Sequence, residues 1–120
     1  MADPRLSIRL DLTSGDRIGP GKIALLEAIQ ATGSISAAAR QLGMSYRRAW
    51  LLVEQLNDAL QQPAVTAAPG GRQGGGAVLT PIGERIIELY RSIEGIARSS
   101  AKEQFRAVGR LVRKSPTVRA

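Results

Sequence analysis

The pattern of apolar and polar positions predicts a short strand followed by helices. Apolar residues alternate with polar ones through residues 6–12, which is typical of a half-buried strand. Residues 13–16 have the composition of a turn. A helix then begins at residues 20–22, and we expect it to end near Gly33. Its apolar face is predicted to contain Ile23, Leu26 and Ile29.

Residues 33–60 predict two further helices joined by a tight turn. Gly43 lies where the turn needs a positive φ, and Ala39 is small where the two helices must cross closely. Ser36 and Ser45 are placed to cap the first and the second helix. This is helix-turn-helix spacing, although an αα-hairpin in another helical domain would share these features. The residues expected to face inward are Ala38, Leu42, Met44, Ala49 and Leu52.

The second helix of this pair opens with side chains suited to a nucleic-acid groove. It begins Ser45-Tyr46-Arg47-Arg48, and we expect Tyr46, Arg47 and Trp50 to point outward. Arg47 is the candidate for bidentate contact with a guanine. Trp50 has two interpretations, a DNA contact through its N–H and a structural role for its ring. The residues predicted to contact phosphates are Ser36, Ser45 and Arg48.

Two short strands are predicted at residues 65–68 and 77–80, on either side of a glycine-rich loop. This loop, residues 69–76, contains five glycines, and no Gly-Lys-Ser/Thr follows that would indicate a phosphate-binding P-loop. One interpretation is a hairpin tip without a role. The other is a wing beside the second helix, whose tip places Arg72 and Gln73 against the DNA backbone or the minor groove.

A long helix is predicted to start at Pro81, with Thr80 as its cap. From Ile82 onward its apolar residues fall at alternating four- and three-residue steps, which is the spacing of a seam for another helix. The other helix belongs either to the protein's own core or to a second copy, and we expect a homodimer. The residues predicted to form the dimer contact are Ile86, Leu89, Ile93 and Ile96.

Beyond residue 100 the apolar pattern weakens, and basic residues recur every four positions. This basic stripe consists of Arg98, Lys102, Arg106 and Arg110. It is interpreted either as a solvated face or as an extra phosphate contact. We therefore divide the chain into a winged helix-turn-helix and dimerisation domain over residues 1–100 and a basic C-terminal tail over residues 101–120.

The amino-acid composition and the distribution of charge exclude several classes of function. The 120 residues include neither Cys nor His, which excludes disulfides, zinc fingers and Ser-His or Cys-His catalytic pairs, so we expect no enzyme activity, cofactor or metal. Without an apparent signal peptide or membrane-spanning run, a cytoplasmic protein is the default expectation. The net charge of +7 lies mainly after residue 97, where seven basic residues accompany one acid. No acid lies between Glu27 and Glu54, as expected of a surface that approaches phosphates.

Two segments carry a resemblance to a known family. Residues 45–50 (SYRRAW) and 70–80 (GGRQGGGAVLT), within a match from about residue 6 to residue 99, resemble the DNA-binding domain of ModE-type molybdate-dependent transcriptional regulators. The DNA-binding domains of LysR-type regulators are more distant relatives of the same plan. The resemblance implies a mostly α protein with small β content, a winged helix-turn-helix that binds operator DNA as a homodimer held by its long C-terminal helices.

The resemblance also implies a difference in ligand control. Members of this family typically carry C-terminal domains that bind molybdate or tungstate, and this chain ends at Ala120, roughly where those domains would begin. We therefore expect a homodimeric, sequence-specific binder of double-stranded DNA, with any sensor supplied by a separate partner. The alternatives are a protein-interaction module on the same fold, which Arg47, Arg48 and Arg72 disfavour, and a small oxyanion sensor that uses the 69–76 loop as an anion nest.

Overall fold

The computed structural model describes residues 4–68 and 76–113 of the 120-residue chain. Within these residues the elements are, in chain order, β1 (Leu10–Asp11), β2 (Arg17–Ile18), α1 (Pro20–Thr32), α2 (Ile35–Leu42), α3 (Tyr46–Ala59), β3 (Val65–Ala67), β4 (Ala77–Leu79), α4 (Pro81–Ser100) and α5 (Lys102–Leu111). The strands pair as two antiparallel hairpins, β1 with β2 and β3 with β4.

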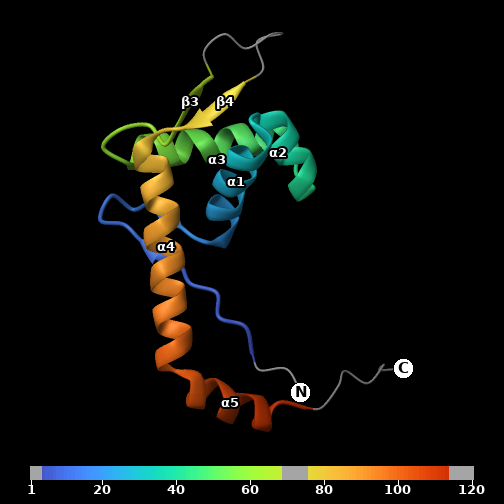
Figure 1. Cartoon of the computed structure of the whole chain (residues 1–120), viewed down its shortest axis with the longest axis vertical. Coiled ribbons are helices and arrows are strands. Elements are labelled where there is room, and N and C mark those ends of the chain that lie inside the picture. The colour runs from blue at the N-terminus through green and yellow to red at the C-terminus, as the bar shows by residue number, and fades with distance from the viewer. Residues whose placement is uncertain (1–3, 69–75, 114–120) are drawn as a thin grey trace.

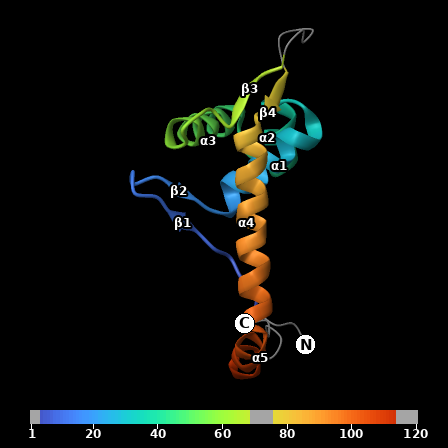
Figure 2. The same ribbon diagram turned by 60° about the vertical axis from the view of Figure 1, so that its left-hand side comes forward.

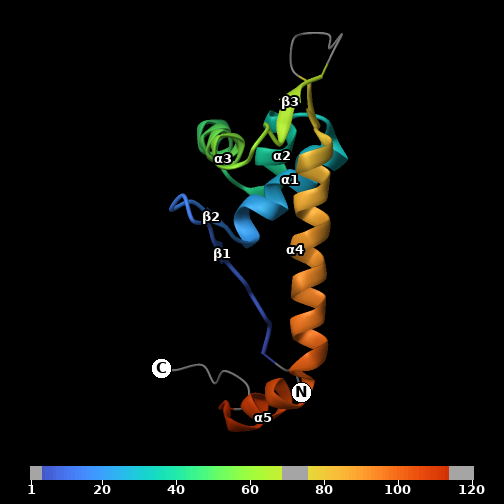
Figure 3. The ribbon, with the colours of Figure 1, turned by 90° about the vertical axis from the view of Figure 1, so that its left-hand side faces the viewer.

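Helices α1, α2 and α3 and the β3–β4 hairpin gather around the N-terminal end of α4 (Figure 1). The rest of α4 extends away from them, and α5 lies across its far end. Figures 2 and 3 show the β1–β2 hairpin beside α4 and below α3. Three helices, a hairpin and a long helix in this order form a winged helix-turn-helix, so the predicted fold class is confirmed.

Helix α1 forms the centre of the hydrophobic core. Its fully buried residues are Ile23, Leu25, Leu26 and Ile29, which include the three that the sequence pattern placed on the apolar face. Ala38 and Ala39 of α2 and Ala49 of α3 are also buried. Because a methyl group is the whole side chain at these positions, α2 can pack closely against both of its neighbours.

Two predictions about apolar positions are wrong. Of the predicted N-terminal strand, only Leu10–Asp11 joins a sheet, where it pairs with Arg17–Ile18. The ladder stays short because helix α1 begins at Pro20 and leaves the chain no further strand residues to pair. Leu42, which was expected to face inward, is 37% exposed because it is the last residue of α2, where the chain already turns toward α3.

The first turn of α4 is attached directly to the chain that leads into β3. Thr80 caps the helix as predicted, since its hydroxyl oxygen accepts from the Gly83 N–H at 3.2 Å. The same hydroxyl donates to the Pro63 carbonyl at 2.7 Å. At Gly83 a Cβ atom would overlap the carbonyl oxygen of Ala64. The close approach of α4 to this backbone therefore requires a residue without a side chain.

Further along α4, two neighbouring residues hold the helix against the rest of the chain. The hydroxyl of fully buried Tyr90 donates to the Ile8 carbonyl at 2.8 Å, and burial raises the pKa of Tyr90. Arg91 donates to both carboxylate oxygens of Glu27, in α1, at 2.7 and 2.9 Å. These hydrogen bonds hold the pKa of Glu27 below its ordinary value. They tie α4 to the N-terminal segment and to the central helix.

Helix α5 is a separate element rather than a continuation of α4. The long helix ends at Ser100, and Ala101, with φ −105° and ψ 21°, separates it from α5. Ten residues of the predicted C-terminal tail are thus helical, and its basic residues Lys102, Arg106 and Arg110 are exposed. Neither α5 nor any other helix in the described part of the chain is long and apolar enough to cross a lipid bilayer.

Two glycines of α4 give a matched test of this packing. Gly83→Ala should destabilise the protein by about 1–3 kcal/mol, because the new methyl group pushes α4 away from the Ala64 carbonyl. Gly95→Ala has open space around the new methyl group and should stabilise the protein by about 0.5–1 kcal/mol through helix propensity. Urea denaturation of the two variants measures both effects. Equal changes in the free energy of unfolding would contradict the close approach at Gly83.

Candidate nucleic-acid interface

The turn between α2 and α3 has the geometry that the sequence predicted. Gly43 takes a left-handed conformation with φ 70°, and its N–H bonds back to carbonyls at the end of α2. Ser45 caps α3, because its hydroxyl oxygen accepts from the Arg48 N–H at 3.0 Å. The glycine reverses the chain and the serine fixes the first turn of α3. Together they set the direction in which α3 presents its N-terminal side chains.

The N-cap of α2 is Ser34, so the prediction that Ser36 caps this helix is wrong. Gly33 ends α1 in a left-handed conformation, and Ser34 follows in extended backbone, where its hydroxyl oxygen accepts from the Ala37 N–H at 2.9 Å. Ser36 is already the second residue of the helix, and a helical residue cannot serve as its N-cap. Its side chain is therefore not engaged in capping and lines a groove described below.

The outer face of α3 carries aromatic and basic side chains. Tyr46 is 53% exposed and Trp50 is 39% exposed, while Arg47 and Arg48 are also exposed. Ala49, Val53 and Leu56 of the same helix are buried in the core, and Val53 lies next to the two aromatic residues. The structure thus gives Tyr46, Arg47 and Trp50 the outward positions that were predicted for them.

The arginines of the helix pair differ from those of α4 in their ion pairing. Arg85, Arg91 and Arg98 in α4 each lie within 4.0 Å of a carboxylate oxygen. In the described part of the chain, Arg47 and Arg48 form no ion pair, although Glu54 lines the same shallow hollow on α3. Their charges are therefore available to an anionic ligand, as the acid-free stretch of sequence predicted.

The β3–β4 hairpin lies beside α3 in the position of a wing. Val65 pairs with Leu79 and Ala67 with Ala77, as the predicted strands required. The N–H of Ala77 also donates to the Gly33 carbonyl at 2.9 Å, which ties the hairpin to the start of the helix pair. The predicted wing-tip residues, Arg72 and Gln73, lie outside the residues that the structure describes.

Asn57 joins α3 to the wing, and the sequence analysis missed it. Its side-chain carbonyl accepts from the N–H groups of Ala64 at 2.8 Å and Val65 at 3.1 Å. Its amide nitrogen donates to the Val65 carbonyl at 3.2 Å. One signal was available in the sequence. An amide four residues after buried Val53 lies on the inner face of α3, where a polar group needs a partner.

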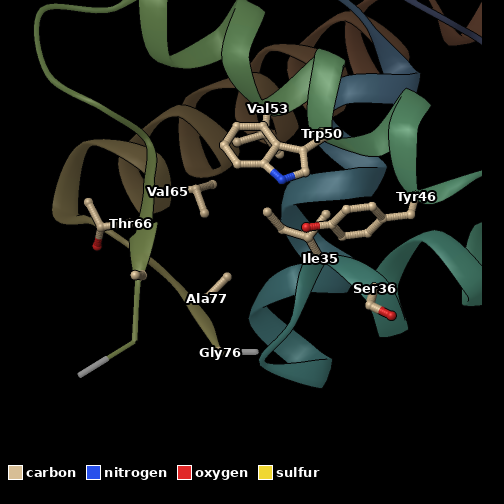
Figure 4. Close-up of a pocket in the computed structure, with 10 residues that line it drawn as sticks. Ile35, Ser36, Tyr46, Trp50, Val53, Val65, Thr66, Gly76 and Ala77 are labelled. Carbon is tan, nitrogen blue, oxygen red and sulfur yellow. The ribbon is translucent and has the colours of Figure 1, made fainter. Parts of the chain in front are cut away.

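A groove of about 560 Å³ runs between the N-terminal half of α3, the start of α2 and the wing. Figure 4 shows the rings of Tyr46 and Trp50 and the side chain of Ile35 lying together on the helix side of this groove. The residues that line the wing side are Val65, Thr66, Ala67, Gly76 and Ala77. The groove is therefore largely apolar, with the serine and threonine hydroxyls of Ser36 and Thr66 beside it.

Three of the four predicted dimer residues form an exposed apolar strip along α4. Leu89, Ile93 and Ile96 are 41%, 42% and 64% exposed. Ile86 is partly buried and packs against the core instead. The residues of α4 that are buried in the chain's own fold, Gly83 and Tyr90, belong to another face. The strip is therefore not part of the core that the described residues form.

A comparison with known families identifies the helix pair and the wing. The model of the bacterial regulatory helix-turn-helix proteins of the lysR family matches residues 21–84, more than half of the chain. The chain belongs to this family. The matched residues run from α1 to the first turn of α4, so they include the capped turn, the basic face of α3 and both strands of the wing.

The resemblance to ModE proteins is also confirmed. MopB of Rhodobacter capsulatus, a molybdenum-pterin-binding protein, is 57% identical over 86 residues, which are 71% of this chain and 32% of MopB. The DNA-binding transcriptional dual regulator ModE of Escherichia coli strain K12 is 45% identical over 71 residues, 59% of this chain and 27% of that protein. The chain thus spans about a third of the length of the curated relatives it matches.

A solved structure supports the fold. The crystal structure of the CbnR DNA-binding domain in complex with DNA aligns with a TM-score of 0.56 at 23% identity. The alignment covers 73% of this chain and 95% of the CbnR chain. Together with the family model, this likeness shows that the chain has the fold of a winged helix-turn-helix DNA-binding domain.

The Asn57 contacts can be tested by comparison with a neighbouring residue. Asn57→Ala leaves the N–H groups of Ala64 and Val65 without their partner and should destabilise the protein by about 1–3 kcal/mol. Gln55→Ala, at an exposed position of the same helix, should change stability by less than about 0.5 kcal/mol. Urea denaturation measures both, and amide exchange at residues 64 and 65 should accelerate only in the first variant. Similar behaviour of the two variants would rule out the proposed attachment.

Proposed function

We propose that this helix-turn-helix protein regulates transcription by binding a specific double-stranded DNA sequence as a homodimer. The observation that carries the proposal is the exposed N-terminal half of α3. Arg47 and Arg48 form no ion pair there with any other described residue, they share a hollow with Trp50, and Tyr46 and Trp50 are both exposed. A helix with this face can enter the major groove with its N-terminal residues next to base edges. The named relatives are regulators or binding proteins, and we assign no catalytic role.

The side chains of the interface divide into base contacts and phosphate contacts. Arg47 is outward on the first turn of α3, where a guanidinium can bond a guanine in bidentate fashion. Arg48 and Ser45 are placed at the edge of the same turn and are assigned to phosphates. Ser36 in the first turn of α2 is assigned to a phosphate as well, and Arg72 and Gln73 to the wing contact. Since the target is chromosomal DNA, we place the action of the protein in the cytoplasm.

The division between base and phosphate contacts predicts two kinds of loss. Arg47→Ala should weaken binding by about 1–3 kcal/mol at one operator position and relax the sequence preference there. Arg48→Ala should weaken binding to all sequences and reduce the slope of log K against log salt by about 0.9 for the lost phosphate contact. Fluorescence anisotropy with specific and scrambled duplexes at several salt concentrations measures both. Equal, sequence-independent losses would contradict the assignment of Arg47 to a base.

The proposed homodimer forms through the exposed strip of α4. The exposed strip Leu89–Ile93–Ile96 repeats at coiled-coil spacing, which favours burial against a second copy. A two-fold dimer would place the two α3 helices on half-sites about 34–36 Å apart, or a multiple of that distance. Each copy would then read one half of a palindromic operator.

A charge placed in this strip tests the dimer. Ile93→Glu should give a helical monomer, because burying an unpaired carboxylate between two helices is strongly unfavourable. Ser99→Glu adds the same charge at an exposed polar position of α4 and should leave the dimer intact. Analytical ultracentrifugation shows the oligomeric state, and circular dichroism shows whether each variant is folded. A wild-type chain that is monomeric at tens of micromolar would refute dimerisation by this strip.

A further inference from the structure

The aromatic pair on α3 is unusual for a surface that meets a polyanion. Tyr46 and Trp50 are four residues apart, so their side chains lie on the same face of the helix. They remain 53% and 39% exposed, although they form one wall of an apolar groove with Ile35. Phosphates offer nothing to the faces of these rings. The rings therefore need an apolar group on the ligand.

The position of the pair limits what that group can be. Tyr46 is the first residue of α3, and the N-terminal residues of such a helix are the ones that reach base edges in the major groove. Of the groups that the four base pairs present in that groove, the 5-methyl group of thymine is the apolar one. The other groups that distinguish the base pairs there are hydrogen-bond donors or acceptors. An aromatic ring at this position therefore gains more from a thymine than from the other bases.

The surroundings of the groove favour duplex DNA over other occupants. Arg47 and Arg48 are exposed on the same turn and form no ion pair within the described residues. The stretch that contributes α2 and the first half of α3 contains no acid between Glu27 and Glu54. Both arginines line a shallow hollow that shares Trp50 with the groove. A ligand that fills the groove and extends past Trp50 therefore meets an apolar contact and then positive charge. This combination suits a thymine edge carried on a phosphate backbone.

We infer that Tyr46 and Trp50, supported by Ile35, form a pocket for thymine 5-methyl groups and make the protein select operators with thymine at the positions facing the start of α3. This inference rests on the proposed function, since it requires α3 to enter the major groove. Tyr46 and Trp50 would thus contribute to sequence specificity by selecting thymine. Arg47 and the aromatic pair would then read neighbouring base pairs by different chemistry.

Thymine replacement tests the inference in the unmodified protein. An operator is first selected by the full 120-residue chain from a random duplex library. Each thymine of its half-site is then replaced in turn by deoxyuridine, which removes the 5-methyl group and leaves base pairing unchanged. Fluorescence anisotropy should show a loss of about fourfold at one or two adjacent positions, the size expected for removing one buried methyl group. No loss above about twofold anywhere would overturn the inference.

Variants of the aromatic pair then connect the effect to these side chains. Tyr46→Ala and Trp50→Ala should each bind more weakly and should reduce the preference for thymine over deoxyuridine. Tyr46→Phe keeps the ring face and should retain the preference. Arg48→Ala is the matched control from the same turn, and it should weaken both duplexes by the same factor. If the preference persists in both alanine variants, the pocket lies elsewhere and the inference is wrong.

The outcomes also separate this inference from the proposed function. Selection that yields no preferred duplex would refute both. A preferred duplex whose thymines all tolerate deoxyuridine would leave sequence-specific binding in place and overturn only the thymine pocket. That result is also the one expected if the groove takes a protein segment or a small effector. Circular dichroism of each variant confirms that it is folded, and the scan of the wild-type chain decides the question without any variant.

Discussion

The short backbone segment at residues 63–65 holds the whole arrangement together. Asn57 of α3 bonds to both polar backbone groups of Val65 and to the N–H of Ala64. From the other side, the N–H of Thr80 donates to the Ala64 carbonyl at 2.9 Å, and Gly83 lets the first turn of α4 lie against the same carbonyl. One stretch of chain therefore fixes α3, the wing and α4 relative to one another.

This attachment explains how the domain holds the exposed part of α3 and the apolar strip of α4 at a fixed distance and angle. The side chains that we propose to read bases are on α3, and the exposed apolar strip is on α4, yet few direct contacts join those two helices. Residues 63–65 instead fix the two helices relative to each other, because both helices bond to or pack against the backbone of this segment. A change at Asn57, Thr80 or Gly83 is therefore expected to alter the angle between α3 and α4, and not only the stability of the domain.

Sequence alone predicted the features that depend on periodicity and on single residues with strong local preferences. The apolar face of α1, the left-handed Gly43, the Ser45 cap and the Thr80–Pro81 start of α4 are examples. Two features that depend on tertiary contacts were missed or wrong. The N-terminal strand lacked an available partner over most of its length, and the role of Asn57 depends on a backbone segment that packs against it.

Competition between two serines explains the error about the cap of α2. Ser34 and Ser36 are both good capping residues, and the sequence offers no rule that ranks them when they lie two positions apart. The choice follows from where Gly33 ends α1, because the residue after a left-handed glycine is the first in extended backbone. Ser36, which does not cap the helix, lines the groove instead. A two-residue uncertainty about the cap is therefore also an uncertainty about which residues line the groove.

The hydrogen bond between Tyr90 and Ile8 has a consequence for the order in which the chain folds. It joins residues 82 positions apart, whereas α1, α2 and α3 make most of their contacts with one another, and α1 also contacts β4 and α4. Closing a long loop is entropically more demanding than forming local contacts. On a ribosome, α1, α2 and α3 can assemble before α4 has been synthesised. The carbonyl of Ile8 can accept the hydrogen bond from Tyr90 only after α4 has been synthesised.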